Sequence, residues 1–83
     1  MQGKRHDLTD DSIILKMGEY GKDPDGVWFM RVPEPGFGMG SLRNHEVTEH
    51  EDGTITVSPS ILCYGHFDKQ WHGYLERGIW RNV

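Results

Sequence analysis

Apolar and polar residues alternate along several short segments of the chain, which is typical of β-strands with one buried face. In the segment 12–19, Ile13, Leu15 and Met17 fall on one side of an extended backbone. The same kind of pattern, rich in β-branched and aromatic residues, predicts further strands at 27–32, 45–49, 54–58, 70–75 and 79–83.

Turn-forming residues separate these segments. Asp23-Pro24-Asp25-Gly26 combines a proline-fixed φ angle with a glycine that tolerates positive φ. Asp52-Gly53 suits a type I′ hairpin turn, and Glu76-Arg77-Gly78 suits a hairpin with a bulge. Pro59 is expected to end the strand before it or to place that strand at an edge.

These elements predict an all-β fold, a single small domain over residues 12–83 with a mostly antiparallel sheet curled into a sandwich or half-barrel. A chain of 83 residues with 11 glycines and no alanine has room for one core and disfavours long helices. The polar segment 1–11 is expected to be flexible. No apolar run approaches the ~20 residues that cross a membrane, so no membrane partner is expected.

The charge adds a constraint on partners. With 9 basic and 13 acidic side chains the net charge is −4, which argues against nucleic acid as a partner, because that binding depends on Lys and Arg. The acidic excess lies in the predicted loops, and it is either a solvated surface or a surface that meets a basic partner. A single cysteine cannot form an internal disulfide, so a cytoplasmic location is expected, in the host cytoplasm if the protein is phage-encoded.

The segment 36–40 is the first candidate for partner binding. Its alternating glycines give a permissive backbone, on which Phe37 and Met39 are expected to be exposed anchors for a protein partner. Glu49 and Glu51 of the neighbouring acidic turn are expected to contribute to the same contact. A homodimer is a further possibility, because the unpaired backbone groups of an edge strand can pair with a strand of a second copy.

The C-terminal third contains side chains that could bind a metal. Cys63 and His66 have the spacing at which both can reach one ion, and His72 lies on the next predicted strand. His45 or His50 could complete a zinc site. Two uses are open: a structural zinc domain, or a zinc-dependent hydrolase with an open ligand position. The alternative is that Cys63 is packed as a small apolar residue and the histidines bind no metal.

The run 52–61, followed by Cys63, His66, the His72 strand and a closing glycine turn, resembles a family of short uncharacterised proteins from bacteria and their phages. The resemblance covers about residues 45–81 and implies a β-rich domain with a zinc site that also uses upstream cysteines. This sequence departs from that pattern, because the stretch 29–35 contains no cysteine.

Together these features predict a small phage or mobile-element accessory protein that binds a host or phage macromolecule without catalysis. The alternative is the zinc-dependent hydrolase or structural zinc domain built on Cys63, His66 and His72.

Overall fold

The computed structural model describes all residues, 1–83, and it confirms the all-β fold. Its only helical element is the short 3₁₀ turn η1 (His66–Asp68), and no helix is long and apolar enough to span a bilayer. The strands are β1 (Lys4–Arg5), β2 (Glu19–Lys22), β3 (Trp28–Met30), β4 (Gly40–Ser41), β5 (Glu46–Glu49), β6 (Ile55–Ser58), β7 (Ile61–Tyr64), β8 (Gln70–Glu76) and β9 (Ile79–Asn82).

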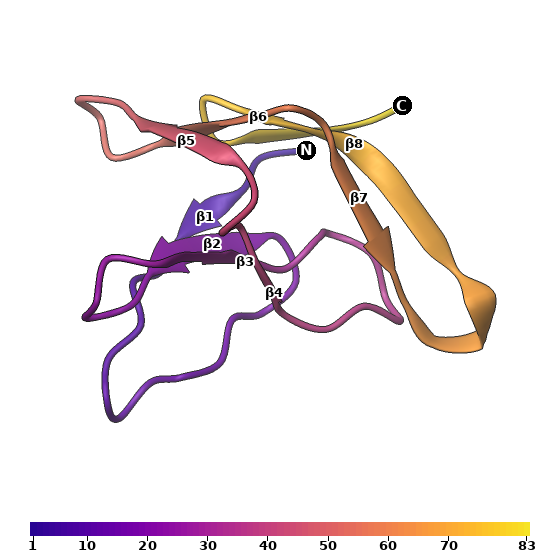
Figure 1. Cartoon of the computed structure of the whole chain (residues 1–83), viewed down its shortest axis with the longest axis horizontal. Helices are drawn as coiled ribbons and strands as arrows, with labels where there is room; N and C mark the ends of the chain where they lie inside the picture. Colours follow the sequence, from indigo (N-terminus) through magenta and orange to yellow (C-terminus); the bar gives the residue numbers. More distant parts are fainter.

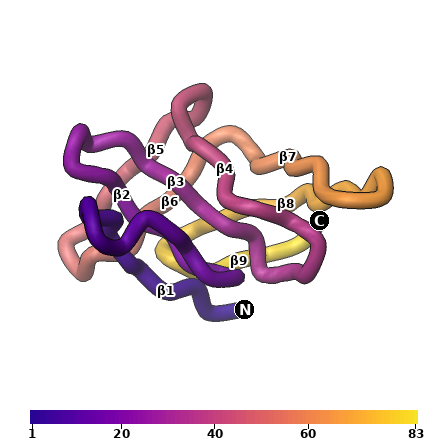
Figure 2. The backbone as a smooth tube through the Cα atoms, turned by 90° about the horizontal axis from the view of Figure 1, so that it is seen from below, coloured from indigo at the N-terminus to yellow at the C-terminus, as the bar shows by residue number.

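The strands form three small sheets arranged in two layers. The first layer is the sheet β1-β2-β3-β4, and the second contains the β5–β6 hairpin and the sheet β7-β8-β9. All neighbouring strands are antiparallel except β1 and β2, which are parallel. Figure 1 shows β8 bending from the upper layer down one side of the molecule, and Figure 2 shows the layers from below. The radius of gyration, 11.8 Å, is that of one compact domain of this length.

The core lies between the two layers. Inward-facing residues of both contribute to one apolar cluster, in which the Trp71 and Trp80 rings meet edge to face with centroids 5.6 Å apart. The indole N–H of Trp80 donates to the carbonyl of Gly18 at 2.9 Å, so this buried polar group is satisfied across the layers. The cluster consists of Tyr20, Met30, Val32, Phe37, Leu42, Ile55, Val57, Ile61, Trp71, Leu75 and Trp80.

The predicted hairpins β5–β6 and β8–β9 are present, but their turns have exchanged types. Positive φ at both Arg77 (47°) and Gly78 (75°) makes the second reversal a two-residue turn of the I′ kind. In the first reversal only Gly53 (89°) has positive φ, and the amide of His50 donates to the carbonyl of Thr54 across a longer loop. The residues that form both turns were predicted correctly, and the type of each turn was not.

The strand predicted at 12–19 is wrong. This segment is a loop in which Leu15 is buried while Ile13 and Met17 are exposed, and β2 begins only at Glu19. The chain turns directly before β2, where Gly18 adopts φ of +81° and the amide of Glu19 donates to the carbonyl of Lys16 at 3.0 Å, so the apolar alternation does not continue into that strand.

The segment 1–11, expected to be flexible, is part of the domain. Its strand β1 pairs with β2, so that Lys4 lies opposite Glu19. The ladder continues beyond β1, because the amide of Leu8 donates to the carbonyl of Lys22 at 3.0 Å. Leu8 itself is buried. The pairing of β1 with β2 could not be predicted, because a strand of two residues is too short to show an alternation of apolar and polar residues.

Candidate functional site

The predicted zinc ligands of β7 and β8 point to opposite faces of their sheet. Cys63 lies opposite Trp71 in the ladder, and the adjacent pair joins Leu62 to His72. Because successive side chains of a strand alternate between faces, Cys63 points inward with the buried Trp71, and His72 points outward to solvent. The sheet therefore separates the sulfur of Cys63 from the imidazole of His72.

His66 and His45 do not complete the zinc site. His66 is exposed on η1. The Nε2 atom of His45 lies 3.2 Å from the carbonyl oxygen of Ser60, and that of His72 lies 2.9 Å from the hydroxyl of the same serine. No group of three His, Cys, Asp or Glu residues converges as a metal ion requires. The structure does not bring the predicted ligands together at one point, so its geometry adds no support to either zinc hypothesis.

Cys63 also lacks the environment of a nucleophile. Burial raises the pKa of its thiol above the ordinary value, so the thiol is protonated at neutral pH. No hydrogen bond joins it to the imidazole of His66 or His72. The thiol behaves as a small packed group at the edge of the core.

Phe37 is not an exposed anchor, as the sequence suggested, because it is 3% exposed in the core. The glycine-rich loop around it folds onto the end of β7 instead of standing free. The amide of His66 donates to the carbonyl of Gly36 at 2.9 Å, and the ammonium of Lys69 lies 5.7 Å from the Phe37 ring centroid. These contacts fix the loop against the second layer.

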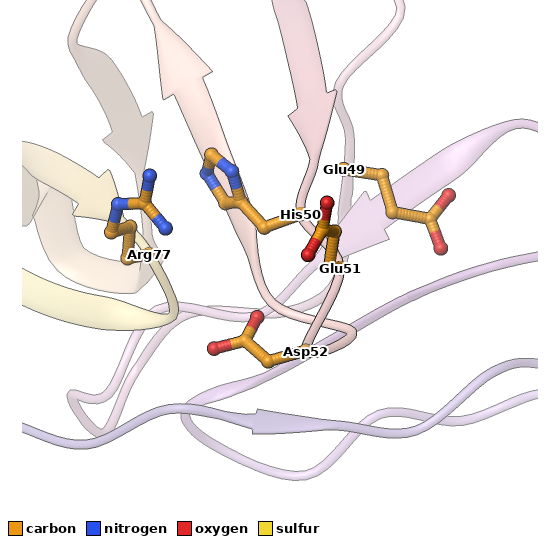
Figure 3. A pocket seen from close by; sticks show the side chains of 5 residues that line it. All are labelled: Glu49, His50, Glu51, Asp52 and Arg77. Carbon is orange, nitrogen blue, oxygen red and sulfur yellow. The ribbon is translucent and has the colours of Figure 1, made fainter.

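Glu49 and Glu51 border a polar depression of about 440 Å³. Figure 3 shows it between the turn of the β5–β6 hairpin and the turn before β9, with the carboxylate of Glu49 directed away from Arg77. Its lining has no apolar side chain and consists of Glu49, His50, Glu51, Asp52 and Arg77.

Most polar groups of this depression already stabilise the fold. Asp52 accepts hydrogen bonds from the hydroxyl and amide of Thr54, which hold the pKa of its carboxyl below the usual range. The Nε2 atom of His50 lies 2.7 Å from the hydroxyl of Thr56. Glu49 pairs with Arg5 of the first layer at 2.7 Å. The depression therefore offers neither a nucleophile nor a set of free ligands.

A second concave surface, the apolar pocket, lies on the outer face of the first layer. It measures about 290 Å³, and its floor consists of apolar side chains from separate segments of the chain. We call its four large apolar lining residues, Leu8, Ile13, Phe29 and Met39, the floor, and its other four lining residues, Thr9, Asp10, Asp23 and Pro24, the rim. Of the partner-binding residues expected from sequence, Met39 is the one that reaches it.

Local contacts shape this pocket. Thr9 and Ser12 exchange backbone hydrogen bonds of 3.0 and 3.1 Å, which close a tight loop and present Ile13. The amide of Leu15 donates to the sulfur of Met39 at 3.3 Å, and Leu15 is fully buried but outside the main core. The loop thus covers part of the sheet with a small apolar cluster of its own and leaves Ile13 66% exposed.

The rim of the apolar pocket is negatively charged. One carboxylate oxygen of Asp23 accepts hydrogen bonds from the amides of Asp25 and Val27, which stabilise the turn. Asp10 is exposed to solvent. Neither Asp10 nor Asp23 forms an ion pair. The sequence signal for this site was the acidic run beside Ile13, which the strand prediction at 12–19 obscured.

Fold and site together describe a small β-domain with an acid-rimmed apolar pocket. No protein-family model, characterised protein or solved structure matches the chain.

Proposed function

We propose that this protein is a small binding module without catalysis, and that its apolar pocket receives a partly apolar, basic segment of a protein partner. The observation that carries the proposal is the coincidence of exposed apolar floor and unpaired carboxylates in one concave site. An accessory role for a phage or mobile element is supported only by the family resemblance of residues 45–81.

The apolar floor would supply the affinity. Contiguous exposed apolar surface on a small soluble protein is typical of interaction sites. Ile13 and Met39 offer adaptable contacts at the floor, and a large apolar side chain that fills such a pocket is the usual centre of a protein interface.

The charged rim would select the partner. Asp10 and Asp23 meet no cation of their own chain, so a lysine or arginine beside the inserted side chain would neutralise them. Complementary charge of this kind mainly sets specificity and the rate of association. The net charge of −4 would favour the same class of partner.

A pair of adjacent isoleucines makes the test sharp. Ile13 lines the pocket and Ile14 does not, yet they are 66% and 67% exposed. A peptide with one leucine flanked by lysines is titrated into isotope-labelled protein, and the amide and methyl resonances are followed by NMR. We expect saturable shifts at Leu8, Ile13 and Met39, which Ile13→Asp abolishes and Ile14→Asp retains.

A matched peptide with glutamates in place of lysines is the control for charge, and it should give no saturable shifts. Shifts elsewhere in the protein, or equal loss of binding in both isoleucine variants, would overturn the proposal.

A further inference from the structure

The edges of the sheets are protected unequally. The outer edge of β9 is covered by the N-terminal segment, because the amide of Trp80 donates to the carbonyl of Met1 at 2.8 Å. The edge strands β1 and β5 carry charged residues, and β4 has only two residues. The sequence of β7 is Ile-Leu-Cys-Tyr, without charge or proline. Charges and coverage are the usual defences against strand addition. β7 has no charge, and it is covered only beyond its C-terminal end, where the amide of His66 donates to the carbonyl of Gly36.

Hydrogen-bond alternation shows which groups of β7 are free. The amide of Val83 donates to the carbonyl of His72, so His72 directs its backbone groups toward β9. In an antiparallel sheet the next residue along β8 directs its groups the other way. Trp71 and Gly73 therefore bond to β7, where Cys63 and Ile61 lie opposite them.

Leu62 and Tyr64 must then direct their backbone N–H and C=O groups away from β8. None of the hydrogen bonds outside the strand ladders engages them. Their side chains lie on the outer face, 50% and 71% exposed. The result is an open edge of two N–H and two C=O groups beside exposed apolar side chains.

We propose that β7 pairs with β7 of a second copy of this chain, antiparallel, about a two-fold axis through Cys63. In this register Leu62 lies opposite Tyr64 of the partner subunit, and Tyr64 opposite Leu62 of the partner subunit. Both are hydrogen-bonded pairs, so every free backbone group of the edge finds a partner.

Other two-fold registers use backbone groups that are already engaged. An axis through Leu62 would require Ser60, whose carbonyl lies 3.2 Å from the Nε2 atom of His45. An axis through Tyr64 would require His66, whose amide donates to Gly36. The neutral sequence of β7 also places no like charges opposite each other. These features favour a second copy over an unrelated strand.

The register makes a geometric prediction. Cys63 and Cys63 of the partner subunit form a pair without backbone hydrogen bonds, in which the Cα atoms are about 4.5 Å apart. A disulfide can span Cα atoms separated by about 4.4–6.8 Å. Added oxidant can therefore join the two thiols, although the dimer does not depend on this bond.

The experiment measures association of the reduced, full-length protein by analytical ultracentrifugation across the micromolar range, and then crosslinking by copper–phenanthroline at alkaline pH. We expect a concentration-dependent dimer that oxidant converts to one covalent species, and no covalent species from Cys63→Ser.

Leu62→Pro removes an outward N–H and should raise the dimer dissociation constant at least about tenfold, because a paired carbonyl also loses its donor. Ile79→Lys lies on the same outer face but off this edge, and should leave the dimer unchanged.

If Leu62→Pro does not fold, Leu62→Lys tests the same contact. It places two like charges near the two-fold axis of the dimer and should also give a monomer. A folded wild-type protein that is monomeric throughout the range, or a dimer that persists in the Leu62 variants, overturns the proposal. A dimer that oxidant does not crosslink overturns the register. None of these outcomes involves the apolar pocket, so the proposed function stands or fails separately.

Discussion

Arg5 connects three parts of the chain through one guanidinium group. It forms a two-point contact with Asp7, with both distances 3.0 Å, and donates to Glu49 at 2.7 Å and to the carbonyl of Gly53 at 3.0 Å. It also lies 5.0 Å from the ring centroid of Trp28. Two-point contacts between arginine and carboxylate are among the stronger surface interactions, so this side chain fastens the β5–β6 hairpin to the first layer.

Replacing Arg5 should therefore destabilise the fold. We expect Arg5→Ala to lower the free energy of unfolding by about 1–2 kcal/mol, a range reduced by partial exposure to solvent. Arg81→Ala is the matched control, because Arg81 contacts only Glu76 and the Tyr74 ring at a fully exposed site, and it should cost much less than Arg5→Ala. Urea denaturation followed by circular dichroism measures both, and equal losses would contradict this role for Arg5.

The same cluster predicts acid sensitivity. Hydrogen bonds from Arg5 hold the pKa of Asp7 below its usual range, and hydrogen bonds from Arg5 and then Lys22 lower that of Glu49. In the unfolded chain both carboxylates take up protons at higher pH than in the folded protein. Their stabilisation is thus complete at neutral pH and decreases as the pH falls below about 4.5 toward the folded-state values.

Melting temperatures measured from neutral pH downward test this. The wild type should lose stability in that acid window, and Arg5→Ala should lose less, because its carboxylates begin with more ordinary pKa values. Asp52 retains its bonds from Thr54 in both proteins, so some acid sensitivity should remain in the variant. Parallel curves for the two proteins would contradict the assignment.

At the scale of the element, the turn between β8 and β9 depends on a glycine for two reasons. Gly78 has φ of +75°, and a Cβ atom there would lie 2.7 Å from the hydroxyl oxygen of Tyr20 and 3.0 Å from Cγ2 of Thr54. Its amide also donates to the carbonyl of Ile55 at 3.0 Å. The turn therefore joins the two sheets of the second layer and approaches the first layer closely.

A comparison of two glycines separates these reasons. Gly26 has a similar φ of +84°, but a Cβ atom added there would meet nothing within 4 Å. Gly26→Ala should cost only the backbone strain, about 1 kcal/mol. Gly78→Ala should cost about 1–3 kcal/mol more, because it adds a steric clash in a packed region. Equal urea midpoints for the two variants would show that the close approach has no energetic effect.

Elements governed by local chemistry could be predicted from the sequence. The hairpins β5–β6 and β8–β9 follow from alternation on both sides of Gly-containing turns, which act over a few residues. The pairing of β1 with β2 could not be predicted, because it joins distant segments and involves only two residues of β1. The loop at 12–18 was misassigned since its apolar residues serve both a local cluster and an exposed pocket.

The candidate site was less predictable than the fold. Whether Cys63 and His72 share a face depends on the register of β7 against β8, and a shift by one residue would reverse the answer. The burial of Phe37 depends on contacts with the distant residues His66 and Lys69. Such information lies in tertiary structure, which residue types and spacing do not contain.

At the scale of the whole molecule, the two proposed surfaces lie apart. The loop that bears Ile13 and the strand β7 are on opposite sides of the chain in both views (Figures 1 and 2). A dimer through β7 would leave both apolar pockets accessible. A partner with two basic segments could then bind more tightly than one segment alone, because the second contact becomes intramolecular.

The arrangement of the tryptophans gives the molecule two separate optical signals. Trp71 and Trp80 are buried and nearly perpendicular, close enough for their electronic transitions to couple, so near-ultraviolet dichroism should arise mainly from this pair. Trp28 is half-buried beneath the cations of Arg5 and Lys22, at 5.0 and 5.4 Å from its ring centroid, and its emission should respond to their loss. Near-ultraviolet circular dichroism and fluorescence emission from one sample can therefore distinguish loosening between the β5–β6 hairpin and the first layer from melting of the core.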